Sequence, residues 1–131
     1  MSLRSPLGKV LGLGSAKAGA HHWWVQRVSA VGLLLLAPWF LFSLIALGDL
    51  SYANVVGWIA TPINTVLLSL LVLTVTYHAQ LGLQVVVEDY VAAKGTKVVV
   101  LLLINFALLV LGVLGVFSVL RIAFGTVTGI A

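Results

Sequence analysis

Three long stretches of this sequence carry no acidic or basic side chain, and they limit the fold more than any other feature. They cover residues 28–47, 62–87 and 98–120, and His78 is the single histidine among them. A helix needs about 20 apolar residues to cross a hydrocarbon core of roughly 30 Å. We therefore expect an all-α membrane protein in which residues 1–131 form one domain with three transmembrane helices.

The composition excludes a soluble globular protein. Hydrophobic residues make up 62% of the 131 residues and charged residues 8%, with a mean hydropathy of +1.22. Soluble domains contain about 25% charged residues, so this chain could not cover a water-exposed surface. It contains no cysteine, which excludes disulfides and thiolate ligation of metals or iron–sulfur clusters by this chain.

The basic residues predict an orientation in the membrane. The net charge is +4, and the bases flank apolar segments instead of forming a patch suited to nucleic acid. Four basic residues precede the first span, namely Arg4, Lys9, Lys17 and Arg27, and two lie between the second and third spans, namely Lys94 and Lys97. The positive-inside rule places these segments on the cytoplasmic side. We expect residues 1–27 to form a cytoplasmic or interfacial arm and the C-terminus to lie on the opposite side.

The first span could instead be a cleaved signal peptide, because bases precede it and "ALG" at residues 46–48 resembles a cleavage site. Its apolar run exceeds the 7–15 residues of a signal core, so we expect a retained helix. Pro38 lies within this run. It should kink the helix or be tolerated through contacts with neighbouring helices.

His78 is the polar residue of most interest, because an ionisable side chain inside a span suggests a function. It lies ten residues before Glu88, about 15 Å along a helix and therefore near mid-membrane. The neutral imidazole expected there can ligate a metal or haem iron, and Gly82 one turn away leaves room for a flat macrocycle. Alternatively, His78 hydrogen-bonds a neighbouring helix that Gly82 lets approach. It could also relay protons, but Glu88 and Asp89 lie too near the helix end to form a chain with it.

Gln80 and Gln84 indicate that the second span is surrounded by other helices and not by lipid. At 100° per residue, these side chains fall on the side of the helix roughly opposite His78. A helix that is polar on two sides cannot face lipid broadly, and three helices are too few to surround it. We therefore expect a heteromeric bundle with a partner membrane subunit, which would also supply the second ligand of a six-coordinate haem.

Polar groups gather at the cytoplasmic ends of the first two spans. Tyr90 could donate a hydrogen bond to a quinone carbonyl, with Asp89 orienting it or supplying protons; alternatively, Tyr90 is an interfacial aromatic residue. In "HHWWVQRVSA", residues 21–30, two histidines and Arg27 could hold carboxylates such as haem propionates. The same stretch also suits an interfacial belt of tryptophans with an arginine that reaches the head groups.

The stretch "HAQLGLQVVVEDY", residues 78–90, resembles the signature of the succinate dehydrogenase hydrophobic membrane anchor (D subunit) family. That signature is a histidine, a glycine four residues on, and Asp-Tyr eleven and twelve residues on, and this sequence fits every position. "HHWWVQR" is similar to the N-terminal element of the bacterial and mitochondrial-type members. The resemblance covers nearly the whole chain, including its length, its spans and its orientation.

The resemblance implies a subunit of succinate:quinone oxidoreductase (respiratory complex II) that is not catalytic alone. Its partners would be a cytochrome b membrane subunit, an iron–sulfur subunit and a flavoprotein, which hold the clusters and the FAD. His78 would be an axial ligand of a b-type haem iron, with Gly82 beside the haem. Arg27 and His21 match positions that face the haem propionates, and the doubled histidine leaves His22 open as the alternative.

By the same resemblance, Tyr90 would hydrogen-bond ubiquinone or another quinone, with Asp89 nearby. Two alternatives compete with this interpretation: a purely structural anchor without haem, and an anchor of the fumarate-reductase type. A small proton-conducting subunit is a further rival, but the first and third spans offer no ionisable path. The short basic arm favours a multi-pass protein of the bacterial inner membrane, with the mitochondrial inner membrane as the alternative.

Overall fold

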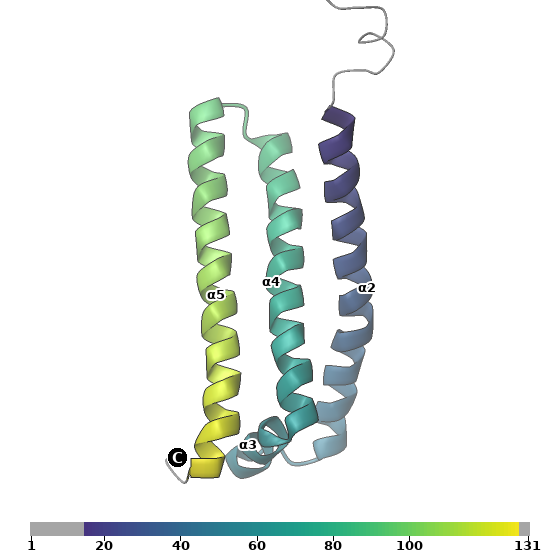
Figure 1. Ribbon diagram of the computed structural model, residues 1–131, viewed down its shortest axis with the longest axis vertical. Helices are drawn as coiled ribbons and strands as arrows, with labels where there is room; N and C mark the ends of the chain where they lie inside the picture. The colour runs from purple at the N-terminus through teal and green to yellow at the C-terminus, as the bar shows by residue number, and fades with distance from the viewer. Residues whose placement is uncertain (1–14, 129–131) are drawn as a thin grey trace, which may run out of the picture.

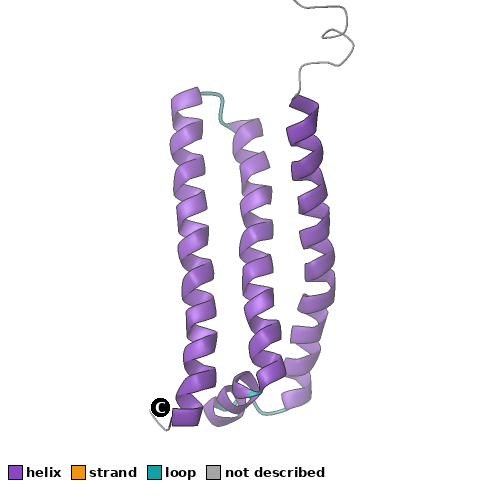
Figure 2. Cartoon of the chain, viewed as in Figure 1, coloured by secondary structure: helices purple, strands orange, loops and turns teal. Residues whose placement is uncertain are grey.

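The structure is a computed structural model that describes residues 15–128, with side chains described over residues 20–125. The described part consists of four helices joined by short connections, and it contains no strand (Figure 2). The helices are α2 (Ser15–Leu47), α3 (Tyr52–Ala60), α4 (Pro62–Tyr90) and α5 (Lys94–Thr128). The all-α fold that the sequence predicted is therefore confirmed.

The three long helices lie side by side, with α4 between α2 and α5 (Figure 1). Each contains a stretch that is long and apolar enough to cross a membrane, namely Ala20–Leu47, Pro62–Tyr90 and Lys94–Gly125. The chain is a multi-pass membrane protein, and the prediction of three spans is confirmed. Because α4 packs against both neighbours, it is the helix best placed to carry polar side chains away from lipid.

All three long helices extend beyond the uncharged runs. α2 begins at Ser15, so residues 15–27 of the expected arm continue the first span as a helix. α4 includes the polar residues 88–90, and α5 begins at Lys94. A helix satisfies its own backbone hydrogen bonds in lipid and at the interface alike, so it has no reason to end where charged residues begin. Residues 1–14 of the arm lie outside the described residues.

Helix α2 continues without interruption through Pro38. Proline has no backbone N–H, so the carbonyl of Leu34 loses its usual partner in the helix. Membrane helices tolerate this loss where neighbouring groups or local adjustments satisfy the freed carbonyl. The span is therefore a single long helix.

A short helix that the sequence did not predict connects the first two spans. The chain leaves α2 through Gly48, whose φ of 69° is readily adopted only by glycine. The Asp49 carboxylate then accepts hydrogen bonds from the backbone N–H of Ser51 and the side-chain amide of Asn54, both at 3.0 Å. These bonds hold the start of α3, which has nine residues and is too short to stand out in a sequence dominated by runs of 20 or more.

Aromatic rings attach α3 to the end of the bundle. Trp58 stacks on Trp39 of α2 with 5.9 Å between ring centroids, and it lies 6.1 Å from the ring of Phe40. After α3, α4 starts with Pro62, at a position where the missing N–H of proline breaks no helical hydrogen bond. In Figure 1, α3 lies across the end of the bundle opposite the start of α2.

Helices α4 and α5 approach closely at two glycines of α5. A Cβ on Gly112 would lie 3.2 Å from the Thr76 hydroxyl, and one on Gly115 would lie 2.7 Å from Cγ1 of Val72. The Thr76 hydroxyl donates to the backbone carbonyl of Val72 at 2.9 Å, so this polar group is satisfied within its own helix. Small residues at such a contact let helix backbones pack tightly in lipid.

Most large apolar side chains of the bundle are exposed. The buried hydrophobic residues among those described are Leu68, Leu81, Val87 and Ala123, and each lies on α4 or α5. By contrast, Leu35 is 69% exposed and Ile45 is 73% exposed on α2. Such surfaces are unsuited to water but suit lipid tails and the helices of other membrane subunits.

Gly115→Ala should destabilise the packing of α4 against α5 by about 1–3 kcal/mol, the usual cost of overpacking. The added Cβ would collide with Val72, a β-branched side chain that is stiff at χ1. The thermal unfolding midpoint of the purified protein in detergent measures the effect. Gly57→Ala is the control, because a Cβ there meets nothing within 4 Å. Adding Val72→Ala should relieve the collision, and equal midpoints for the two glycine variants would contradict the close contact.

Candidate functional site

His78 extends from α4 toward α2, where its two ring nitrogens meet two side chains. Nδ1 lies 2.9 Å from the hydroxyl oxygen of Ser29, and Nε2 lies 3.5 Å from the side-chain nitrogen of Gln26. Ser29 is only 8% exposed, and its hydroxyl also contacts the backbone carbonyl of Gln26 at 3.0 Å. The imidazole is therefore held between two helices.

Gly82 leaves a space beside His78 that Gln26 partly fills. A Cβ added to Gly82 would lie 3.7 Å from the side-chain nitrogen of Gln26, which is an ordinary van der Waals distance. The same nitrogen lies 3.5 Å from Nε2 of His78, at the long limit for a hydrogen bond. The Gln26 carboxamide thus covers Nε2 loosely, and a group that binds Nε2 would have to displace it.

A cavity of about 570 Å³ opens between α2 and α4 at Gly82. Its lining comes from both helices and consists of His22, Trp23, Gln26, Arg27, Gly82, Gln84, Val85 and Glu88. Two buried polar atoms of the lining, Nε2 of His22 and Oε1 of Gln26, have no hydrogen-bond partner within the described residues. Buried polar atoms are rarely left unsatisfied in native proteins, so these two indicate a site that is completed by a molecule from outside this chain.

The structure distinguishes the two neighbouring histidines of α2. His22 is partly buried and lines the cavity, whereas His21 is exposed and is not among the lining residues. Successive helical residues point about 100° apart, which explains why only one of the pair can face α4. Arg27 also lines the cavity, and its guanidinium lies 5.4 Å from the ring centre of Trp23. A cation over an indole face is a favourable arrangement that holds the Arg27 side chain near the cavity.

Asp89 and Tyr90 are the last two residues of α4, and both are exposed. Tyr90 is 85% exposed. It lies at the same end of the bundle as the first turns of α2 (Figure 1), but twelve residues from His78, or about 18 Å along the helix. The structure therefore brings Gly82, His22 and Arg27 around one cavity. His78 lies behind this lining, in contact with Gln26, and Asp89 and Tyr90 lie separately at the end of α4.

A sequence model of the succinate dehydrogenase/fumarate reductase transmembrane subunit family matches residues 1–122. The chain belongs to this family. A relative from Rickettsia bellii, called succinate dehydrogenase hydrophobic membrane anchor subunit, is 36% identical over 118 residues, covering 87% of this chain and 94% of the relative. The subunit of the same name from Paracoccus denitrificans is 27% identical over 116 residues, covering 88% and 89%. The succinate dehydrogenase membrane anchor subunit of Reclinomonas americana is 31% identical over 103 residues, covering 74% and 83%.

Four further polar residues of this transmembrane subunit lie beside His78 or in the cavity lining, and the sequence pattern did not point to them. Ser29 and Gln26 contact His78, and Gln84 and Glu88 line the cavity. Gln84 was expected opposite His78, but its long side chain lines the cavity with Gly82 and donates to the Glu88 carboxylate at 2.8 Å. A glutamine and an acid four residues apart on a helix are within reach of each other, and this spacing was the available signal.

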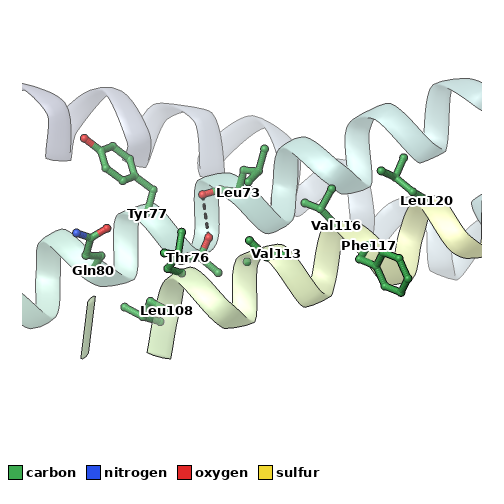
Figure 3. A pocket seen from close by; sticks show the side chains of 11 residues that line it. Leu73, Thr76, Tyr77, Gln80, Leu108, Val113, Val116, Phe117 and Leu120 are labelled. Atoms are coloured by element: carbon green, nitrogen blue, oxygen red, sulfur yellow. Dashed lines mark hydrogen bonds between the residues drawn. The ribbon is translucent and has the colours of Figure 1, made fainter. Parts of the chain in front are cut away.

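Gln80 lies in a second hollow, between α4 and α5. This groove of about 490 Å³ is lined mainly by leucine, valine and phenylalanine, with Thr76, Tyr77 and Gln80 as its polar members. Figure 3 shows Gln80 and Tyr77 toward one end of the groove and Phe117 and Leu120 toward the other. α4 therefore carries polar side chains on two sides, as the sequence predicted, with His78 toward α2 and Gln80 in the groove beside α5.

The described residues contain no group of three or more histidine, cysteine or acidic side chains that could hold a metal ion together. This part of the transmembrane subunit does not by itself form a protein-only metal cage. A haem iron would need fewer protein ligands than a metal ion held by protein alone, because the porphyrin itself binds the iron. Nε2 of His78 lies 3.5 Å from the side-chain nitrogen of Gln26, which also lies beside Gly82.

Proposed function

We propose that this chain is the hydrophobic membrane anchor of a succinate:quinone oxidoreductase and contributes to binding b-type haem and quinone. The family match and the names of the relatives from Rickettsia bellii and Paracoccus denitrificans support the anchor role. The observation that carries the haem proposal is the position of His78 between α4 and α2, with Nε2 facing Gln26, a residue that lines the cavity at Gly82. The haem would supply a one-electron redox centre, which His78 would hold together with a residue of a cytochrome b membrane subunit.

The residues around His78 fit a haem in three respects. Nε2 contacts the Gln26 carboxamide only at the long distance of 3.5 Å. Gly82 has no side chain to obstruct a flat ring, and the adjoining cavity holds unsatisfied buried polar atoms. His78 would hold the iron, while the residues nearby shape the space and keep lipid and water out.

His22 and Arg27 are the residues that we assign to the haem propionates. Both line the cavity, and both can donate hydrogen bonds to a carboxylate. The sequence favoured His21 with His22 as the alternative; we prefer His22 because its buried Nε2 lacks a partner, whereas His21 is exposed.

Tyr90 and Asp89 are the residues that we assign to the quinone. A phenol donates a hydrogen bond to a quinone carbonyl, and an adjacent carboxylate can deliver protons as the quinone is reduced. At 85% exposure, Tyr90 cannot enclose a hydrophobic molecule by itself. The iron–sulfur and cytochrome b subunits would complete this site, and the flavoprotein would carry out the oxidation of succinate.

We further propose that the N-terminus and the loop between α4 and α5 face the cytoplasm of a bacterium, with the bundle in the inner membrane. The distribution of basic residues supports this orientation, and Lys97 strengthens the loop by donating to the Glu88 carbonyl at 2.8 Å. In this orientation His22, Arg27, Asp89 and Tyr90 all lie at the cytoplasmic end, where the soluble subunits would dock.

His78→Ala should remove or shift the haem signal of the assembled complex, because alanine cannot ligate iron. The measurement is the reduced-minus-oxidised optical spectrum, normalised to flavin, of the complex purified in mild detergent. His21→Ala is the matched control and should retain the full signal, since His21 is exposed. An intact wild-type complex without haem would leave this chain as a purely structural anchor.

His22→Ala should lower haem retention by about ten- to a hundredfold, because a hydrogen bond to a charged group contributes about 1.5–3 kcal/mol. Haem per flavin after repeated washing in detergent measures retention. The adjacent variant His21→Ala provides the comparison, with the same change of side chain one residue away. Equal losses in the two variants, or a loss confined to His21→Ala, would contradict the assignment of His22.

Tyr90→Phe should slow quinone reduction by about three- to tenfold, the effect of losing one neutral hydrogen bond of roughly 0.5–1.5 kcal/mol. Steady-state turnover with a soluble quinone analogue measures this loss. Succinate oxidation with a water-soluble artificial acceptor should stay unchanged, because it bypasses the membrane subunits. Unchanged quinone turnover would make Tyr90 an interfacial aromatic residue only.

A further inference from the structure

The hydroxyl of Ser29 has two partners but a single proton. It lies 3.0 Å from the backbone carbonyl of Gln26 and 2.9 Å from Nδ1 of His78. A carbonyl oxygen can only accept, so the hydroxyl proton goes to the carbonyl of Gln26 and the hydroxyl oxygen accepts from His78. This assignment places the proton of the neutral imidazole on Nδ1 and the lone pair on Nε2.

The side chain of Gln26 agrees with this tautomer. Its amide nitrogen, a donor, is the atom that faces Nε2 of His78, at 3.5 Å. Donors and acceptors then follow one direction, from the Gln26 amide through the imidazole and the Ser29 hydroxyl to the Gln26 backbone carbonyl. The carboxamide oxygen is left buried without a partner, which makes the amide an easily displaced cover for Nε2.

Because Ser29 is buried, water cannot easily replace it as the hydrogen-bond partner of Nδ1 of His78. At 8% exposure, Ser29 is shielded from solvent that could replace its hydrogen bond. The protonated Nδ1 then has to find its acceptor in Ser29, and an unsatisfied buried donor is costly. Since Ser29 lies on α2 and His78 on α4, the bond also fixes the rotation of the imidazole ring.

We propose that Ser29 is a positioning residue that holds His78 in the tautomer needed for ligation through Nε2. This proposal rests on the haem-anchor function proposed above and adds a residue to it. A hydrogen bond from Nδ1–H makes an imidazole a more basic ligand, which stabilises ferric over ferrous iron. Loss of the Ser29 hydroxyl should therefore weaken haem binding and raise the haem midpoint potential.

The test uses the complete complex carrying Ser29→Ala, with haem per flavin and the haem midpoint potential as readouts. Loss of a partner of a metal ligand commonly changes affinity by about 10–100-fold. A tenfold loss of preference for ferric iron is equivalent to about 59 mV for a one-electron couple, and we expect an upward shift of that order. Ser29→Thr, which keeps the hydroxyl, should restore the wild-type potential.

Two further variants separate positioning from packing. Ser69→Ala is the matched control, because the Ser69 hydroxyl donates to the carbonyl of Thr65 in its own helix and should leave the potential unchanged. Ser29→Cys keeps the volume of the side chain but offers only a weak acceptor, so it should shift the potential even if Ser29→Ala fails to assemble. A wild-type potential in an assembled Ser29→Ala or Ser29→Cys complex would overturn the proposal.

Nitrogen NMR of the full chain, labelled with ¹⁵N-histidine and placed in lipid nanodiscs without haem, tests the tautomer directly. The expected spectrum has a protonated Nδ1 and an unprotonated Nε2 for His78, identified by its loss in His78→Ala. A protonated Nε2 in the wild-type chain would overturn the role of Ser29 whether or not the complex binds haem. Absence of haem from the wild-type complex would instead contradict the proposed function.

Discussion

The arrangement of α2 against α4 depends on the polar contacts of one imidazole, that of His78. A polar group inside a bilayer has no water to bond to, so its partners must come from protein. His78 finds them in Ser29 and Gln26, two residues of the neighbouring helix. These contacts fix how α2 is rotated against α4, and that rotation in turn decides which other side chains of α2 reach the cavity.

Close packing on the other side of α4 comes from small residues. Gly112 and Gly115 let α5 approach until Thr76 and Val72 would collide with any added Cβ. The middle helix is thus held on the α2 side by hydrogen bonds together with a close approach at Gly32, and on the α5 side by van der Waals contact. This division leaves the outer faces of α2 and α5 largely apolar and exposed, as a subunit needs when lipid and partner helices are its surroundings.

The sequence predicts well what lies within one helix and poorly what depends on two. The spacing of His78 and Gly82 shows that they share a face, and the uncharged runs show three spans. The contacts of Ser29 and Gln26 with His78 depend on the register and rotation of α2 against α4, which one sequence does not contain. The choice between His21 and His22 depends on the same rotation. The short helix α3 was missed because its start is set by local bonds to Asp49.

The length of α4 has an electrical consequence for any charge held at His78. The helix has 29 residues and is about 42 Å long, so about 6 Å would extend past each side of a 30 Å hydrocarbon core. In the proposed orientation His78 then lies about 12 Å inside the cytoplasmic boundary, or about two-fifths of the way across. A full unit charge at that depth would feel about 0.9 kcal/mol for every 100 mV of membrane potential, taking 2.3 kcal/mol per 100 mV for complete transfer. The redox equilibrium of a group bound at His78 would therefore respond to the energised state of the membrane.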